Sequence, residues 1–320
     1  MDKQKVLLLG GSGFVGTYIA NRLSERGVLV TIPTRRRERG KALIMLPGVE
    51  MVQADINCQA SLNELVRGHD AVINLVGQLH SRDVKFPYSR DFGEAHVELP
   101  KRIIAACRAA GVRRLLHMSA LKAAPGAPSE YLASKGEGEQ LVMAAQGELD
   151  VTVFRPSVIF GRGDAFLSMF ARILKLSPIF PLGYGQARLQ PVWVGDVAEA
   201  FVAAIKDQAT FGQAYDLCGP RAYTLRELVE YTAELCGSCA RVIAIGDGLA
   251  YVQAGLMWLA PKPLMSPDNL RSLQVDSVCD AACQAPPNWR PLALEAEAPV
   301  YITGRKIKER LDHYRFRAGR

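Results

Sequence analysis

A tyrosine and a lysine four residues apart, Tyr131 and Lys135, are the residues of this 320-residue chain best suited to proton transfer. A spacing of four places both on one face of a helix, where the lysine cation would lower the pKa of the phenol. Such a phenol can give or take a proton near neutral pH. Ser119 ends an apolar run 12 residues earlier, and from there its hydroxyl could orient a substrate carbonyl. The same spacing also occurs in ordinary surface pairs, so the surrounding sequence has to decide between the two.

A glycine-rich segment from Gly10 to Gly16 follows an apolar run and precedes a helical pattern. Glycines at this spacing allow a tight turn, a close approach of the backbone to a pyrophosphate, and packing of the helix on the strand. The start of the helix then offers free N–H groups and a positive dipole to the phosphates. We therefore predict dinucleotide binding rather than a plain tight turn. The predicted contacts are Gly10, Ser12, Gly13, Phe14, Val15 and Gly16.

The residues after the second apolar run predict which dinucleotide binds. A chain that binds NAD carries an acid there for the ribose, but residues 28–37 contain no acid and include Arg35 and Arg36. Guanidinium groups can hold a 2′-phosphate through paired hydrogen bonds. The sequence therefore favours NADP(H) over NAD(H). Glu38 keeps NAD(H) open, and a solvated helix start is the alternative for the arginines.

Two later strand ends extend the predicted cofactor site. Asp55 and Ile56 follow the third apolar run, where a carboxylate can face the adenine edge, and Val76 and Gly77 follow the fourth. The carboxyl ends of parallel strands border the crevice in which such cofactors bind. Ordinary turn chemistry is the alternative for both pairs.

The elements that must position these residues follow from the pattern of apolar runs. Strands are predicted at residues 6–9, 28–32, 49–52, 71–76, 115–118 and 151–154, and helices at 15–26, 62–66, 99–110, 135–145, 197–205, 225–235 and 249–259. Apolar strands separated by helices predict a doubly wound parallel α/β sheet, covered on both faces. Residues 1–155 are predicted to form this Rossmann domain, with residues 188–217 returning to it. Residues 156–320 are predicted to form a smaller α+β substrate lobe and a basic C-terminal tail.

The charge of the chain is concentrated at its end. The net charge is +7, and residues 305–320 contain seven cations and two acids. Such a tail can bind an anionic membrane face or an acidic partner, although a solvated helix is the commoner reading of such a run. No basic stripe interleaved with aromatic residues points to nucleic acid. The composition is that of a globular protein, which excludes disordered, collagenous and coiled-coil classes.

Two further patterns bear on location and metals. The longest apolar run, residues 249–260, is too short for a membrane span of about 20 residues, and no leader pattern is recognisable, so we expect a cytoplasmic protein. Peripheral attachment to the inner membrane, through this run and the tail, is the alternative. Cys236 and Cys239 could form a zinc site with Cys279 and Cys283, but their spacing is unusual and we predict no metal.

In combination, these motifs resemble the extended and atypical short-chain dehydrogenases/reductases, over at least residues 5–205. Residues 154–161 resemble the stretch that runs past the nicotinamide in this family, which adds Pro156 to the predicted cofactor contacts. Residues 31–35, 96–98 and 118–121 are most similar to the branch that contains the NADPH-binding accessory subunit of respiratory complex I. His96 occupies a position where many extended members have Asn. A proton relay is one reading of this residue, and a histidine at the edge of the core is the simpler one.

The resemblance implies hydride transfer between NADP(H) and a small-molecule carbonyl or hydroxyl substrate, with Tyr131 as acid/base, Lys135 as its support and Ser119 as carbonyl ligand. An apolar substrate such as a quinone or a lipid precursor fits this reading, and epimerisation is a related possibility within the family. It also implies an alternative, because members of this branch can bind nucleotide without turnover as accessory or assembly subunits of complex I. The intact Tyr131/Lys135 pair favours the enzyme.

Overall fold

The computed structural model describes residues 3–81, 88–258 and 265–303. Its centre is a seven-stranded parallel sheet in the order β11-β6-β5-β4-β1-β2-β3. The strands are β1 (Lys5–Leu9), β2 (Leu29–Thr34), β3 (Val49–Gln53), β4 (Ala71–Asn74), β5 (Arg114–Met118), β6 (Asp150–Pro156) and β11 (Gln213–Leu217). The chain winds outward from β1 to β3, crosses back to β4, and winds outward again to β11. The predicted doubly wound parallel α/β fold is confirmed.

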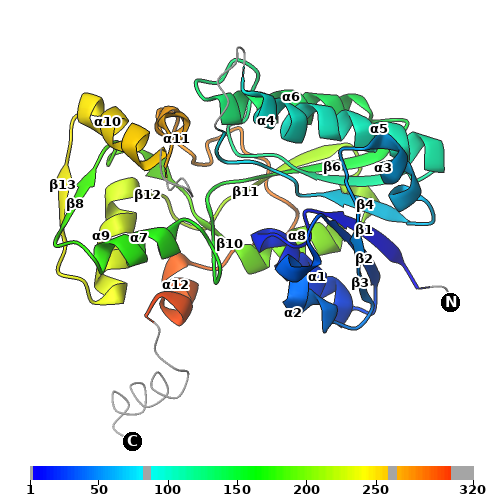
Figure 1. The fold of residues 1–320 in the computed structure, drawn as a ribbon, viewed down its shortest axis with the longest axis horizontal. Coiled ribbons are helices and arrows are strands. Elements are labelled where there is room, and N and C mark those ends of the chain that lie inside the picture. The colour runs from blue at the N-terminus through cyan, green and yellow to red at the C-terminus, as the bar shows by residue number, and fades with distance from the viewer. Residues whose placement is uncertain (1–2, 82–87, 259–264, 304–320) are drawn as a thin grey trace, which may run out of the picture.

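Helices cover both faces of this sheet (Figure 1). Helices α1 (Phe14–Glu25), α2 (Lys41–Ile44) and α8 (Val194–Ala204) pack on one face, and α3 (Gln59–Val66), α5 (Leu99–Ala110) and α6 (Glu130–Ala144) pack on the other. In β1, Val6 and Leu8 face the first set while Leu7 and Leu9 face the second, and none of the four is exposed. A strand that is buried on both faces consists of a continuous run of apolar residues, so such strands can be predicted from the sequence.

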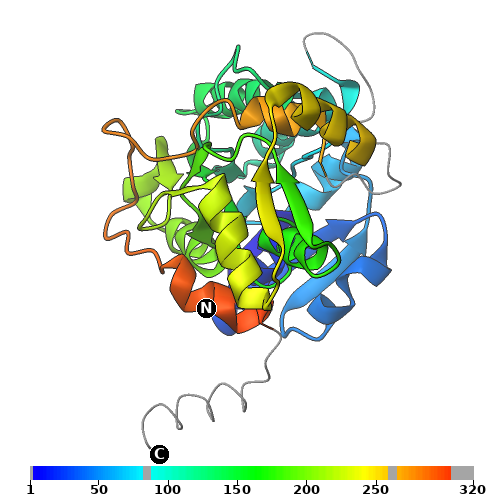
Figure 2. The same ribbon diagram turned by 90° about the vertical axis from the view of Figure 1, so that its left-hand side faces the viewer.

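The second lobe is smaller and lies at the carboxyl edge of the sheet, on the left of Figure 1 and facing the viewer in Figure 2. Its helices are α7 (Leu167–Leu174), α9 (Leu225–Cys236), α10 (Asp247–Trp258), α11 (Pro267–Ser272) and α12 (Leu294–Ile302). Its main sheet pairs β8 (Ile179–Leu182) with β13 (Arg241–Ala244) in parallel. Phe170, Phe180 and Leu228 are among the buried residues of its separate core.

Short strands and loops tie the lobe to the sheet. Strand β7 (Ile159–Phe160) pairs with β10 (Val192–Trp193), and β9 (Arg188–Leu189) pairs with β12 (Tyr223–Thr224). From β10 the chain returns to the sheet through α8 and β11. Near the end of the described chain, the indole of Trp289 donates a hydrogen bond to the Cys218 carbonyl at 2.9 Å. The chain therefore passes between the two parts several times.

Four shorter turns complete the described chain: α4 (Arg90–Gly93), a π-helical turn (Glu94–Glu98) and two 3₁₀ turns (Arg37–Gly40 and Gln208–Thr210). Cys279 and Cys283 are joined in a disulfide, whereas Cys236 and Cys239 are free thiols. Within the described ranges, no group of three or more His, Cys, Asp or Glu side chains is placed to hold a metal ion. Among the same residues, no helix has both the length and the apolarity to cross a bilayer. The basic tail predicted to bind a partner lies outside the described residues, as do Leu259 and Ala260.

Candidate active site

The glycine-rich loop connects β1 to α1 at the carboxyl edge of the sheet. Gly10 has a φ of +82°, in the left-handed region that favours glycine. A Cβ at Gly16 would lie 2.5 Å from the carbonyl oxygen of Gly10, so a larger residue would push the helix off the loop. Gly13 begins α1 without a side-chain cap, and the first turn contains no acid. The N–H groups of that turn therefore remain available to an anion such as a pyrophosphate.

The other predicted loop residues surround this helix start. Val15 is buried in the core, whereas Ser12 and Phe14 are half-buried. The loop that follows β7 packs on Phe14, since a Cβ at Gly163 would lie 3.7 Å from the Phe14 ring. The end of β6, where the buried Pro156 lies, and the segment that follows it thus come to the same edge of the sheet as the glycine-rich loop.

Arg35 and Arg36 follow β2, which neighbours β1, and both are exposed. The backbone turns at this point because the Thr34 hydroxyl accepts a hydrogen bond from the N–H of Arg36 at 3.3 Å. Both arginines thus lie just beyond the end of the strand that pairs with β1, the strand that leads into the glycine-rich loop. Asp55 lies one strand further out, and its carboxylate accepts the N–H of Asn57 at 3.0 Å, which is a local turn contact. Ile56 packs half-buried against the core.

The side chain of Lys135 is hydrogen-bonded to the chain at the ends of both β4 and β5. Its side chain is buried, and Nζ donates to the carbonyl of Met118 at 2.9 Å and to that of Val76 at 3.4 Å. A Cβ at Gly77 would lie 3.3 Å from Nζ, so Gly77 leaves the ammonium close to the crevice. Burial lowers the pKa of Lys135 to about 8. The amine is therefore mainly cationic at neutral pH and can lose its proton at moderately higher pH.

Tyr131 stands one helical turn before Lys135 on α6. Its half-buried ring packs edge-on against His96, with 5.6 Å between ring centroids, and against Phe92 at 6.4 Å. The lowered phenol pKa expected from the neighbouring lysine is wrong for this structure, because burial raises the pKa of Tyr131 to about 12. The cause is the desolvation of the phenolate in this packing. At neutral pH the phenol keeps its proton.

Ser119 follows β5 directly and is only 2% exposed. Its N–H donates to the Phe154 carbonyl at 2.8 Å, which fixes the backbone, but the buried hydroxyl has no hydrogen-bond partner among the described residues. An unpaired buried hydroxyl is costly unless a ligand or a water satisfies it. Of the alternatives at this strand end, Ala120 and Leu121 are buried and apolar, so Ser119 carries the one side-chain hydroxyl of these three residues.

His96 has a structural role in this arrangement. Its Nε2 accepts the N–H of Gln78 at 2.9 Å, and its Nδ1 lies 2.8 Å from the hydroxyl of Ser134. The Ser134 hydroxyl in turn donates to the Tyr131 carbonyl at 3.1 Å. With both ring nitrogens bonded, and with burial holding its pKa well below the usual range, the ring stays neutral. This geometry fits a histidine at the core edge better than a proton relay.

Sequence reasoning missed a second buried histidine beneath the site. His117 on β5 receives a hydrogen bond at Nδ1 from the Asn74 amide, 3.1 Å away, and burial lowers its pKa to about 3. The Asn74 oxygen accepts the N–H of Val76 at 3.1 Å and shapes the end of β4. A histidine inside an apolar strand carries no local signal, so only the pairing of β4 with β5 reveals it.

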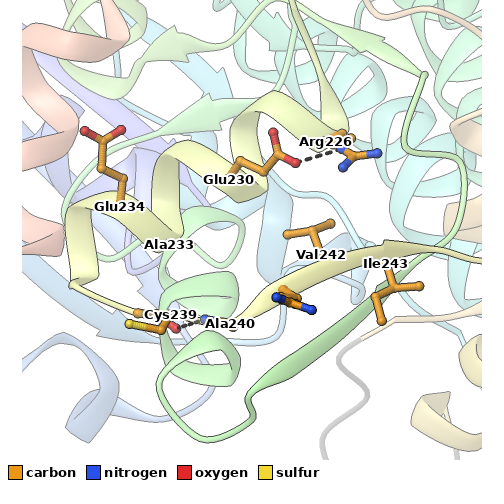
Figure 3. Close-up of a pocket in the computed structure, with 10 residues that line it drawn as sticks. Arg226, Glu230, Ala233, Glu234, Cys239, Ala240, Val242 and Ile243 are labelled. Atoms are coloured by element: carbon orange, nitrogen blue, oxygen red, sulfur yellow. Dashed lines mark hydrogen bonds and ion pairs between the residues drawn. The ribbon is translucent and has the colours of Figure 1, made fainter.

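A separate open groove of about 620 Å³ lies in the lobe between α9 and β13 (Figure 3). The ion pair between Arg226 and Glu230, at 2.7 Å, borders it, and Cys239 lies at its other end. None of its lining residues belongs to the predicted site.

Comparisons with known proteins show the family to which this sequence is similar. The sequence model of the "NAD dependent epimerase/dehydratase family" matches residues 6–218. The chain is 34% identical over 231 residues to "NADH dehydrogenase [ubiquinone] 1 alpha subcomplex subunit 9, mitochondrial" of Mus musculus, covering 70% of this chain and 59% of that relative. It is 31% identical over 260 residues to "(4-alkanoyl-5-oxo-2,5-dihydrofuran-3-yl)methyl phosphate reductase" of Streptomyces griseus, covering 81% and 83%.

Solved structures agree on the fold. The UDP-glucose 4-epimerase of Thermus thermophilus, in complex with NAD, superimposes with a TM-score of 0.64 at 24% identity. The match covers 76% of this chain and 86% of the epimerase. This level of identity supports the fold alone.

Proposed function

The chain belongs to the NAD dependent epimerase/dehydratase family, and from this premise we propose that it is an NADP(H)-dependent oxidoreductase that reduces a carbonyl group. The observation that carries the proposal is the convergence of three groups at one end of the sheet. These are the proton-bearing phenol of Tyr131, the buried ammonium of Lys135 and the unpaired hydroxyl of Ser119. The free helix start of α1 borders the same edge.

The proposed chemistry uses Tyr131 and Lys135 in the protonation states that they have at neutral pH in the folded chain. NADPH held by the glycine-rich loop and the start of α1 would supply the hydride for the carbonyl carbon, and the carbonyl oxygen would need a proton from the protein. The Ser119 hydroxyl donates a hydrogen bond to that oxygen and polarises the carbonyl. Tyr131 transfers its proton to the oxygen as the alcohol forms, and the nearby ammonium of Lys135 stabilises the resulting phenolate. A phenol that is kept protonated by burial favours this reductive direction.

Specificity for NADP(H) is proposed to come from Arg35 and Arg36. Both residues are exposed and directly follow β2, the strand that pairs with β1 beside the glycine-rich loop. No acid precedes them in residues 28–34 to bind a ribose 2′-hydroxyl in the manner of NAD-binding chains. The substrate is proposed to have a large apolar part, such as a quinone or a lipid precursor, since the Streptomyces relative is named a reductase of a phosphate ester that carries an alkanoyl group.

The test compares purified wild type with Tyr131→Phe, using the fluorescence of bound NADPH. A panel of long-chain ketones and alkyl quinones is added to each. We expect one member to oxidise NADPH in the wild type only, while both proteins bind NADPH with similar affinity because the phenylalanine keeps the ring. Equal oxidation by both proteins would show that Tyr131 is not the acid. Tight binding without oxidation by any member would contradict the enzyme.

A second candidate function is a nucleotide-binding accessory or assembly subunit of respiratory complex I. It is favoured by the 34% identity to the mitochondrial subunit of Mus musculus. The match spans 59% of that relative's length, so the remaining 41% has no counterpart in the alignment. The basic residues 305–320 are the proposed attachment segment. Native gels of solubilised membranes should show the chain migrating with a large complex, and deleting residues 305–320 should release it; migration alone in both cases would contradict this function.

A further inference from the structure

Asp268 of the lobe forms two hydrogen bonds to the start of the helix that carries Tyr131. Its Oδ1 accepts the N–H of Glu130 at 2.8 Å, and its Oδ2 accepts the N–H of Tyr131 at 3.1 Å. These amides belong to the first turn of α6 and therefore have no partner within the helix. A carboxylate at this end also interacts favourably with the helix dipole. Asp268 is only 9% exposed, so water competes weakly for these bonds.

The usual cap of α6 is already present and does not replace Asp268. The hydroxyl of Ser129 accepts the N–H of Leu132 at 3.1 Å. The carboxylate from α11 therefore binds the first two amides of the helix, and the serine binds the third. The Asp268 carboxylate therefore satisfies two N–H groups that Ser129 leaves unpaired, and because it comes from α11 it also ties the lobe to the start of α6, at the residue that carries the phenol.

The helix that presents Asp268 is firmly held. Ser266 and Asn269 form a reciprocal capping box at the start of α11, and Leu270 is buried against Ala250 and Ala254 of α10. The Asn269 amide also donates to the carbonyl of Leu79, in the loop after β4, at 3.5 Å. Helix α11 thus contacts both α6 and the loop after β4, beside the site, and Figure 1 shows it on the side of the lobe nearest to α6.

We propose that Asp268 is a positioning residue for Tyr131. By holding the backbone N–H of Tyr131, it fixes the phenol against His96 and Phe92 at the carboxyl edge of the sheet. The lobe that is proposed to receive the substrate thereby sets the place of the proton donor. This inference rests on the proposed role of Tyr131 in the reduction.

The principal variant is Asp268→Asn, which keeps the size of the side chain. It replaces one accepting oxygen with an NH₂ group, which is a donor and cannot accept the backbone N–H that faces it. Asp276→Asn is the matched control, because Asp276 also accepts a backbone N–H, that of Arg188 at 2.9 Å, elsewhere in the lobe. Three properties are measured on the full chain: hydrogen exchange of the Glu130 and Tyr131 amides, the ¹³Cζ resonance of Tyr131 in tyrosine-labelled protein, and NADPH affinity by fluorescence. The resonance is assigned with Tyr131→Phe.

In Asp268→Asn we expect faster exchange of both amides and a shifted Tyr131 resonance, with NADPH affinity unchanged because the glycine-rich loop is untouched. With whichever ketone or quinone of the panel the wild type reduces, kcat should fall about 10- to 100-fold, the order of loss that a small misplacement of a catalytic group causes. The control should match the wild type in every measurement.

Unchanged exchange and an unchanged Tyr131 resonance in Asp268→Asn would overturn the inference. So would a loss of kcat that the Asp276→Asn control shares. If Asp268→Asn does not fold, Asp268→Glu replaces it: the longer carboxylate should move the Tyr131 resonance by less, and no movement would again overturn the inference. If the wild type reduces no member of the panel, the proposed function fails, while the exchange and resonance measurements still decide whether Asp268 holds Tyr131.

Discussion

At the scale of single residues, Arg35 and Arg36 give a direct test of cofactor choice. Replacing both with alanine should weaken NADPH binding by about 100-fold or more, because each charge-assisted contact to the 2′-phosphate contributes about 1.5–3 kcal/mol. NADH has no 2′-phosphate, so its affinity should hardly change. Fluorescence titration with both nucleotides measures this. Arg241→Ala, at an exposed arginine of the lobe, is the control; equal losses for NADPH and NADH would exclude the arginines as the source of specificity.

Lys135 gives a second residue-scale prediction, for the dependence of stability on pH. Its pKa is about 8 in the folded chain, against 10.5 for an ordinary lysine. Between these values the unfolded chain binds a proton that the folded chain does not, so the free energy of unfolding should rise as the pH increases from about 8 towards 10. The rise is on the order of 3 kcal/mol at most.

Denaturant unfolding at several pH values checks this prediction. Lys135→Met should lack the rise, so the difference between the two proteins isolates the lysine from the other titrating groups, which both proteins share. A wild type and a variant that change in parallel across this range would show that Lys135 is not desolvated in the folded chain.

At the scale of elements, α6 approaches the π-helical turn so closely that only glycine fits between them. A Cβ at Gly138 would lie 1.9 Å from the carbonyl oxygen of His96. Gly138→Ala should therefore destabilise the chain by about 1–3 kcal/mol or more, the range for overpacked sites, and should disturb the Tyr131 site. Gly255→Ala in α10 is the control, since nothing lies within 4 Å of its added Cβ. Thermal unfolding compares them, and similar midpoints would contradict the close approach.

Most elements of the sheet could be predicted because they are encoded locally. A strand buried on both faces is a run of apolar residues, so β1 and β4 are visible in the sequence, whereas β11 (Gln213–Leu217) mixes polar residues and was only placed within a returning segment. Helix α6 begins at Glu130 and not at Lys135 as predicted, because Ser129 caps it. Ser129 is a typical N-cap residue, so this helix start could have been predicted from the sequence.

The site was predictable in its residue types and not in its energetics. The sequence shows a lysine four residues from a tyrosine, but the burial that raises the phenol pKa depends on how His96 and Phe92 pack against the ring. Asp268 lies 137 residues after Tyr131, so no local pattern connects them. A contact between residues so far apart in the sequence is created by the tertiary fold.

At the scale of the whole molecule, the repeated passage of the chain between lobe and sheet predicts one unfolding transition. The lobe is also hydrogen-bonded to the sheet domain, since Asp268 accepts two N–H groups of α6 and Asn269 donates to the Leu79 carbonyl. Near- and far-ultraviolet circular dichroism should therefore follow the same melting curve. Saturating NADP⁺, at about 100 times its Kd, should stabilise the folded chain by about 2.7 kcal/mol and raise that single midpoint. Two separate transitions would show that the lobe unfolds independently.

The carboxylate that caps α6 has a consequence for how such chains can be recombined. The family match ends at residue 218, after the last strand of the sheet, whereas Asp268 lies 50 residues beyond it. A chimaera that joined residues 1–218 to the lobe of a distant relative would inherit a complete sheet and a complete glycine-rich loop. It would lose the anchor of its own Tyr131 unless the incoming lobe happened to present an acid at the same place. Exchange of lobes is therefore constrained by one side chain that neither the sheet nor the nucleotide-binding loop contains.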